Sequence, residues 1–215
     1  FDYVELRFLA MTDEENSWSD RMVPYLRHIS GLKGIDLDGT EVTDKGLATM
    51  GTMPELISLS AGNGFITGRC LPALLGCKKL TELRFGGADV NNDSLRYLQN
   101  FPQLSHLGLT RVNLSVSGLE HVCKCRGLTD LDIDFNRDIE DKAVPFLLKL
   151  PKLQRLSVKQ TKISVAALES LGRHGLVGID LPKPFGEYAP SEQRRIRKAF
   201  PAIPFKIKAV EGVDS

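Results

Sequence analysis

The chain has 215 residues and a nearly balanced charge, with 28 lysine and arginine residues against 27 aspartate and glutamate residues. Hydrophobic residues make up 42% and charged residues 26% of the chain, which predicts a folded, soluble protein rather than a disordered one. No apolar run approaches the roughly 20 residues of a membrane-spanning helix, and the balanced charge argues against a dedicated nucleic-acid-binding protein. No basic and apolar leader precedes Phe1, so we expect any targeting segment to lie outside this sequence.

The first predicted element is a divergent strand motif, Phe1-x-x-Val4-x-Leu6. The next copy of this motif begins only at Leu32. The acidic and polar residues 13–20 around Trp18 are therefore predicted to form a loop that holds the extra length.

From Leu32 onward an L-x-x-L-x-L pattern recurs about every 24 residues, which indicates a repeat architecture. The copies begin at Leu32, Leu56, Leu80, Leu104, Leu128, Leu153 and Leu176. Each copy ends in an alternation of apolar and polar residues, which predicts a short strand with one buried face.

Each strand motif is followed by a turn and by a predicted helix. An apolar residue and then a polar one precede the predicted helix: Val42-Thr43, Ile66-Thr67, Val90-Asn91, Leu114-Ser115, Ile139-Glu140 and Ile163-Ser164. Where the polar residue is Thr, Asn or Ser, its side chain could cap the first amides of the helix. The helix shows apolar residues at a spacing of three, as in Leu95, Leu98 and Phe101. A proline such as Pro102 then ends it.

A unit this small cannot bury its apolar face alone, so neighbouring units must stack. Stacked strands lie about 4.8 Å apart, whereas helices are about 10 Å wide, so the array must curve with its strands inside. We therefore predict an α/β fold, a right-handed curved solenoid with a concave parallel sheet and convex helices. About eight units would occupy residues 1–181.

These residues resemble the leucine-rich repeat family. The unit Leu32-x-x-Ile35-x-Leu37-Asp38-Gly39-Thr40-x-Val42-Thr43-Asp44-x-Gly46-Leu47 is most similar to the cysteine-containing subclass, which accompanies F-box proteins, and to arrays of planctomycete-type bacteria. The resemblance implies a protein-interaction scaffold that binds partners on its concave face. The turn position that often holds Asn or Cys in this family is varied here, so we expect its side-chain ladder to be interrupted: Thr40, Gly64, Ala88, Val112, Asn136 and Thr161.

After Leu181 the repeat ends, and residues 182–215 are predicted to form a C-terminal cap and tail, because solenoids need atypical terminal units. Ser191 is predicted to cap a helix from Glu192 to about Phe200, and residues 203–210 alternate like an edge strand. The alternative interpretation is an anion-binding or partner-docking patch of Arg194, Arg195, Arg197 and Lys198.

The four cysteines lack the paired spacing of a zinc site. Cys77 and Cys125 occupy a core position of the repeat, and Cys70 occupies a position that favours a small side chain. Only Cys123 has no packing explanation from the pattern. Unpaired thiols favour a reducing compartment such as the cytoplasm.

The outward strand positions should form columns across the concave face, and these hold the candidate binding residues. One column places Glu82, His106, Asp130 and Arg155 next to one another, as a charge ladder. The candidate partner-binding residues are Asp36, Asp38, Glu82, Arg84, His106, Asp130, Asp132, Asp134, Arg155 and Lys159.

Asp130, Asp132 and Asp134 should project to the same side of one strand, about 6–7 Å apart. Three such carboxylates would attract a cation. A metal ion needs its ligands at about 2–2.6 Å. We therefore favour Lys or Arg side chains of a protein partner over a metal ion at these three aspartates. Acidic groups of the partner would then meet Arg155 and Lys159.

Signatures of enzymes are missing: the sequence has no phosphate-binding P-loop, no dinucleotide fingerprint and no H-E-x-x-H motif. We therefore predict a non-catalytic, monomeric scaffold without metal or cofactor that binds an unidentified protein through its concave face. The alternatives are a substrate-recognition subunit of a ubiquitin-ligase-type complex, whose adaptor segment would lie outside this sequence, and a purely structural array that assembles through its ends.

Overall fold

The computed structural model describes residues 3–5, 19–62 and 65–205. The predictions for Phe1, Leu6, Trp18, Gly64 and residues 206–215 lie outside the described residues.

The strands form one open, parallel sheet of eight strands in chain order. They are β1 (Tyr3–Glu5), β2 (Gly34–Asp36), β3 (Ser58–Ala61), β4 (Glu82–Gly86), β5 (His106–Thr110), β6 (Asp130–Asp132), β7 (Arg155–Ser157) and β8 (Gly178–Asp180). Each central position of a motif pairs with the same position of the next, as in Leu83 with Leu107 and Leu131 with Leu156. The predicted solenoid with its parallel sheet is confirmed.

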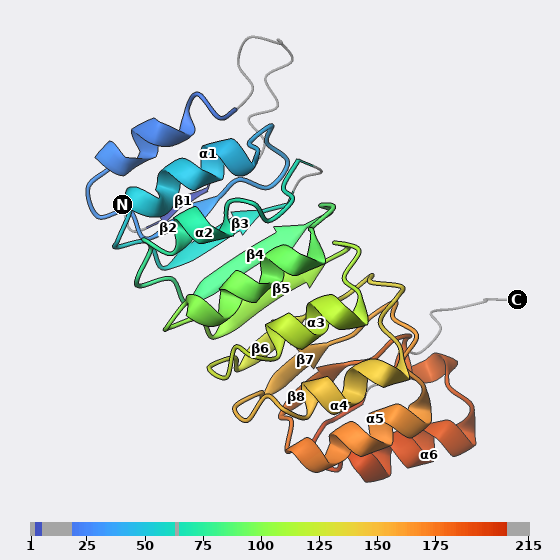
Figure 1. Ribbon diagram of the computed structural model, residues 1–215. Coiled ribbons are helices and arrows are strands. Elements are labelled where there is room, and N and C mark those ends of the chain that lie inside the picture. Colours follow the sequence, from blue (N-terminus) through green and yellow to red (C-terminus); the bar gives the residue numbers. More distant parts are fainter. Residues whose placement is uncertain (1–2, 6–18, 63–64, 206–215) are drawn as a thin grey trace, which may run out of the picture.

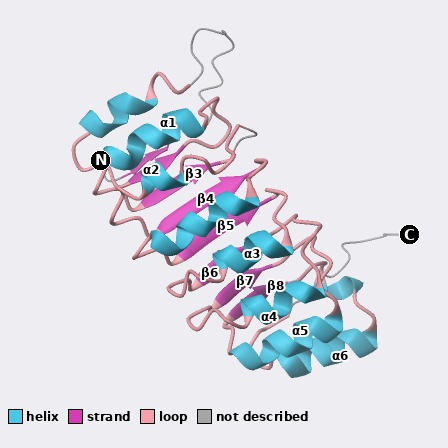
Figure 2. Ribbon diagram, viewed as in Figure 1, coloured by secondary structure: helices cyan, strands magenta, loops and turns pink. Residues whose placement is uncertain are grey.

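Short helices run back along the opposite side of each unit, so that all of them cover one face of the sheet (Figures 1 and 2). The α-helices are α1 (Asp44–Ala48), α2 (Leu71–Leu74), α3 (Val116–Val122), α4 (Val144–Leu147), α5 (Val165–Leu171) and α6 (Pro190–Ala199). The 3₁₀ helices are η1 (Val23–His28), η2 (Thr49–Thr52), η3 (Asn92–Asn100), η4 (Asp141–Ala143), η5 (Gly172–His174) and η6 (Phe185–Glu187). No helix among the described residues is long and apolar enough to cross a membrane.

The core lies between the sheet and the helices and consists of the leucines of the repeat. Leu83 and Leu107 from the strands and Leu119 from α3 are buried in one continuous cluster. All four cysteines belong to it, including Cys123, for which the pattern gave no packing reason. Burial of these apolar side chains stabilises the fold, and a single unit could not bury them without its neighbours.

The polar residues before the helices act partly as predicted. Side chains of Thr43, Asn91, Ser115 and Ser164 cap their own helices, whereas Glu140 makes no side-chain cap and α2 starts after Cys70 rather than Thr67. An aspartate or asparagine of the preceding unit also accepts hydrogen bonds from the amide and hydroxyl of the Thr or Ser at this position in the next unit: Asp20 with Thr43, Asp44 with Thr67, Asn92 with Ser115 and Asp141 with Ser164. The units are therefore joined by polar contacts on the outside of the core as well as by leucines inside it.

The turn ladder is interrupted, as expected. Asn136 is buried, accepts from the amides of Val112 and Leu114, and donates to the Leu109 carbonyl at 2.7 Å. At the same position Thr40 and Thr161 donate their hydroxyls to the carbonyl three residues earlier, at 2.7 Å each, and Thr40 also accepts from the amide of Val42 at 3.5 Å. Threonine thus satisfies one local acceptor but does not reach the neighbouring unit.

The C-terminal segment corrects two expectations. The helix begins at Pro190, with Ala189 rather than Ser191 before it, because Pro190 supplies a preset φ and the Glu192 carboxylate accepts from the Ala189 amide at 2.9 Å. Residues 203–205 do not form the predicted edge strand. Helix α6 packs on α5, where Arg195 forms two hydrogen bonds with Glu169.

Candidate functional site on the concave face

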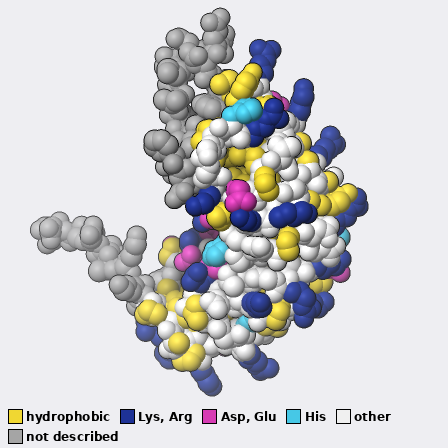
Figure 3. Space-filling model, turned by 90° about the vertical axis from the view of Figure 1, so that its left-hand side faces the viewer, with side chains coloured by type: hydrophobic (Ala, Val, Ile, Leu, Met, Phe, Trp, Pro, Cys, Tyr) yellow, Lys and Arg dark blue, Asp and Glu magenta, His cyan; other side chains and the backbone are white. Residues whose placement is uncertain are grey.

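The strand register brings the predicted charge ladder together. Glu82 of β4, His106 of β5, Asp130 of β6 and Arg155 of β7 are direct neighbours across the sheet. Because each strand alternates, their side chains leave the face opposite the helices. In Figure 3, acidic, basic and histidine side chains gather on the hollowed side of the molecule.

Asp130 is the centre of this ladder. Its carboxylate contacts His106 Nε2 at 3.2 Å, the Nε of Arg155, and the Thr129 hydroxyl at 2.7 Å. Partial burial alone would raise the pKa of Asp130, but the hydrogen bonds from Thr129 and Arg155 and the nearby His106 outweigh it and lower the pKa. The carboxylate is therefore held ionised between Arg155 and His106.

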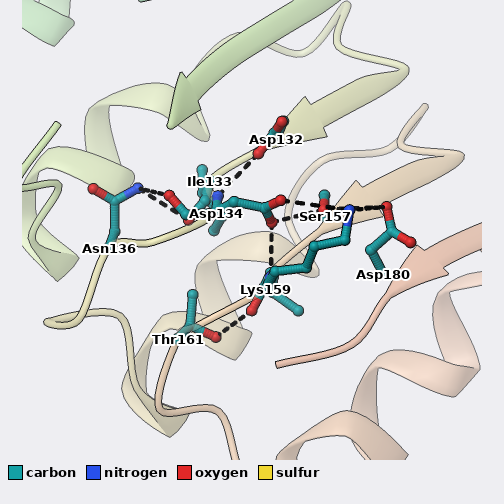
Figure 4. Close-up of polar contacts among 9 residues, drawn as sticks. Asp132, Ile133, Asp134, Asn136, Ser157, Lys159, Thr161 and Asp180 are labelled. Carbon is teal, nitrogen blue, oxygen red and sulfur yellow. Dashed lines mark hydrogen bonds and ion pairs between the residues drawn. The ribbon is translucent and has the colours of Figure 1, made fainter. Parts of the chain in front are cut away.

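Asp134 does not face the open surface. It is buried, and its Oδ1 accepts hydrogen bonds from the Ser157 hydroxyl at 2.6 Å and the Lys159 amide at 2.7 Å (Figure 4). Asp132 Oδ1 accepts from the amide of Asp134 at 2.9 Å, and Lys159 Nζ lies 3.6 Å from Asp134 and 2.9 Å from Asp180. Burial raises the pKa of Asp134, and the neighbouring Asp132 adds to this, while hydrogen bonds from Ser157 and Lys159 oppose it.

The same arrangement occurs near the other end of the sheet. Asp36 Oδ1 accepts from the amide of Asp38 at 2.9 Å, and Asp38 Oδ1 accepts from the Ser60 hydroxyl at 2.7 Å and from the amide of Gly62 at 2.5 Å. Asp36 is buried. Both Asp-x-Asp sequences are thus inter-repeat clasps, in which the second aspartate bonds to the next strand.

This finding corrects the expectation of an open acidic patch. Asp36 and Asp134 are buried and therefore out of reach of a partner's side chains. The Ser157 hydroxyl and the Lys159 amide of the next unit draw the Asp134 carboxylate onto the sheet. The Asp36 carboxylate instead accepts from the Asp38 amide of its own unit. Among the described residues there is also no group of three or more side chains that could hold a metal ion.

Glu82 and Arg84 form a separate pair on β4. Arg84 Nη2 lies 2.5 Å from Glu82 Oε1, and the Ser58 hydroxyl donates to Glu82 Oε2 at 3.1 Å. The next strand carries Gly108 opposite Arg84, so the stem of Arg84 lies over a position without a side chain.

The concave face contains a hollow of about 710 Å³. Arg84, His106, Asp130, Asp132 and Arg155 from the predicted set contribute to it, together with Asp180, Ile203 and Pro204, which were not in that set. Asp180 could have been found, because it continues the column of Asp132 and Ser157. Ile203 and Pro204 could not, because they follow α6 and carry no repeat signal.

A smaller hollow of about 380 Å³ adjoins the first beyond β8. Both share Ile179, Asp180, Ile203 and Pro204, and the smaller one adds Lys159 together with aromatic side chains: Phe135, Phe185 and Phe205. Of the predicted set, Asp36, Asp38, Glu82 and Asp134 line neither hollow.

The chemistry available in the larger hollow is that of hydrogen bonds and ion pairs. The Ser105 hydroxyl lies 2.8 Å from His106 Nδ1, but it also contacts the Thr81 carbonyl at 3.3 Å. Thr81 and Thr129 hydroxyls donate to carbonyls one strand back in the same way. Ser105 therefore belongs to a row of hydroxyls that bond to the preceding strand, and this structural contact explains where its side chain lies.

No family model matches this sequence, and no curated protein sequence matches it. Among solved structures, an internalin of Listeria monocytogenes is similar with a TM-score of 0.54 and 19% identity, over 75% of this chain and 51% of that chain. A leucine-rich repeat protein of Leptospira interrogans is similar with a TM-score of 0.54 and 17% identity, over 86% of this chain and 51% of that chain. The chain spans about half the length of these neighbours. With its repeats, its parallel sheet and these neighbours, the chain has the leucine-rich repeat fold.

Proposed function

We propose that this protein is a non-catalytic scaffold that binds a protein partner through the hollow on its concave face. The observation that carries this proposal is the hollow of about 710 Å³, in which charged side chains of β4, β5, β6 and β7 converge. A preformed surface on a rigid sheet loses little conformational entropy on binding, which favours affinity.

The ends of the array serve a different purpose in this proposal. The assignment of residues 182–215 to a cap and tail stays a prediction, and the packing of α6 on α5 supports a cap over the last unit. The cysteine-containing subclass and a role in a ubiquitin-ligase-type complex stay predictions, as do the monomeric state and a reducing compartment.

A steric block tests the binding face. Gly178 lines the hollow, and a Cβ added there would meet Arg155 Cγ at 3.4 Å, an ordinary contact distance. Gly178→Trp should therefore fill part of the hollow while the sheet stays intact. Lys124→Trp introduces the same indole side chain at an exposed position after α3, outside the hollow, and is the control.

The measurement is selection of binders from a random peptide library on the wild-type chain, followed by titration of the selected peptides on both variants. Selected peptides should lose about tenfold or more in affinity on Gly178→Trp and keep it on Lys124→Trp. Unchanged affinity on Gly178→Trp, with an unchanged melting temperature, would contradict binding through the concave face.

A further inference from the structure

Most carboxylates of the candidate site are already occupied by the protein itself. Asp134 accepts from Ser157 and Lys159, and the side chain of Asp134 is only 7% exposed. Asp130 is held by His106, Arg155 and Thr129 and is 19% exposed. Few of their lone pairs remain for a partner.

The cationic side chains of the same surface are open. Arg84 is 62% and Arg155 is 59% exposed, and Lys159 is 49% exposed. Within the described part of the chain, Arg84 is paired through Nη2 with Glu82, and Arg155 through Nε with Asp130. The other N–H groups of both guanidinium groups are therefore available to a partner.

The two arginines have a defined separation. Arg84 lies on β4 and Arg155 on β7, three strands away, and Arg155 is in register with Glu82, two residues before Arg84. At a strand spacing of about 4.8 Å and a rise of about 3.3 Å per residue, their backbones lie about 16 Å apart, and their long side chains can shorten the distance between the two guanidinium groups by a few ångström. An extended chain rises about 3.3 Å per residue, so two residues four apart span about 13 Å. Carboxylates at this spacing would reach both guanidinium groups, which bind carboxylates with good geometry.

The far end of the hollow is apolar. Ile179, Ile203 and Pro204 line it there, beside Asp180. Asp180 is exposed but is paired with Lys159 at 2.9 Å, so its charge is partly compensated. This end suits an apolar side chain that follows the acidic residues.

From these observations we infer that the concave hollow takes an extended, acidic segment of a partner protein, with two carboxylates about four residues apart on Arg84 and Arg155. This inference rests on the proposed function and adds the chemistry of the partner. It keeps the expectation that acidic groups of a partner meet Arg155, and it drops the expectation that lysines or arginines of a partner meet Asp130, Asp132 and Asp134.

The test uses three labelled peptides that differ only at two positions about four residues apart: Glu in one, Gln in the second and Lys in the third, each followed by a leucine. Binding to the full chain is measured by fluorescence anisotropy. The Glu peptide should bind about tenfold tighter than the Gln peptide, and its affinity should fall as ionic strength rises from about 0.01 M to about 0.15 M. The Lys peptide should bind least.

Charge reversal supplies the second arm. The double variant Arg84→Glu with Arg155→Glu should lose the Glu peptide and prefer the Lys peptide, a switch that a merely structural role of the arginines would not produce. The neutral pair Arg84→Gln with Arg155→Gln keeps the test valid if the reversal impairs folding, and should bind all three peptides alike. Lys124→Glu with Arg173→Glu makes the same charge change at exposed positions outside this hollow and should leave the preference unchanged.

Equal binding of the Glu and Lys peptides to the wild-type chain, or unchanged preference in the reversed variant, would overturn the inference. The proposed function has a separate criterion. If the library peptides lose affinity on Gly178→Trp but show no excess of acidic residues, binding through the concave face is supported and only the inference of an acidic partner is contradicted.

Discussion

The Asp134 carboxylate accepts a hydrogen bond from the Ser157 hydroxyl at 2.6 Å, across the boundary between two neighbouring units of the solenoid. The contact joins the end of one strand motif to the middle of the next. It also explains why an aspartate on the concave side is buried: the next strand supplies the donors that solvent would otherwise provide.

Removal of this clasp should destabilise the protein. Asp134→Ala leaves the Lys159 amide without its acceptor and removes the shorter of the two hydrogen bonds of the Ser157 hydroxyl, which also contacts Asp180 at 3.3 Å. It should therefore lower the free energy of unfolding by about 1–3 kcal/mol. Asp134→Asn keeps an acceptor oxygen and removes a charge that burial disfavours, so it should cost less than Asp134→Ala. Urea unfolding measures both, with Asp138→Ala at an exposed position as the control. Equal stabilities of Asp134→Ala and Asp138→Ala would contradict a clasp.

Asp44 predicts a pH dependence. Burial alone would raise the pKa of Asp44, but hydrogen bonds from the hydroxyl and amide of Thr67 and from Cys70 outweigh it and lower the pKa below its usual 3.8. The ionised carboxylate is thus favoured in the folded state, so its contribution is complete above pH 3.8 and is lost as pH falls through the lowered pKa.

Asp44→Asn should therefore destabilise the protein by about 1–2 kcal/mol near neutral pH, and the difference from wild type should shrink below pH 3.8. Unfolding curves at neutral and acidic pH measure it, with Asp138→Asn as the control. A difference that stays constant across this range would show that the charge of Asp44 does not contribute.

Two exposed glutamines should respond to glycine with opposite signs. Gln160 has a φ of 55°, where the equivalent turn positions of other units hold Gly39 and Gly87. Gln160→Gly should stabilise the protein by about 0.5–1 kcal/mol, because glycine adopts this conformation without strain. Gln99→Gly, within η3, should destabilise it by a similar amount. Thermal unfolding measures both, and the same sign for the two changes would refute the argument from backbone strain.

The four thiols should be unreactive in the native protein. Burial raises the pKa of Cys77 to about 11 and those of Cys123 and Cys125 to about 12, and raises the pKa of Cys70 as well. At neutral pH a thiol reagent should therefore label none of them until denaturant is added, and then all four. Rapid labelling of one thiol before unfolding would place that cysteine outside the core, and fewer than four labels afterwards would indicate a disulfide.

The repeat in the sequence was sufficient to predict the fold and the columns of the concave face. A strand has a side-chain period of two, and the units recur at a nearly constant interval, so the neighbours of Asp130 could be named as His106 and Arg155 before any coordinates. The helices were harder: a unit of this length leaves room for only a short helix, and the apolar spacing predicted a helix at η3 without deciding between the α and the 3₁₀ form.

By itself, the sequence thus determined which residues share a column, because regular spacing fixes register. Only the tertiary structure decided which of those residues meet solvent. Asp134 and Arg155 both start from the concave side, but hydroxyl and amide donors on the next strand draw the short carboxylate inward, while the long guanidinium extends past its one partner. The approach of Ile203 and Pro204 to the hollow was equally unpredictable, because it depends on how the chain returns after α6, and no periodic pattern encodes that path.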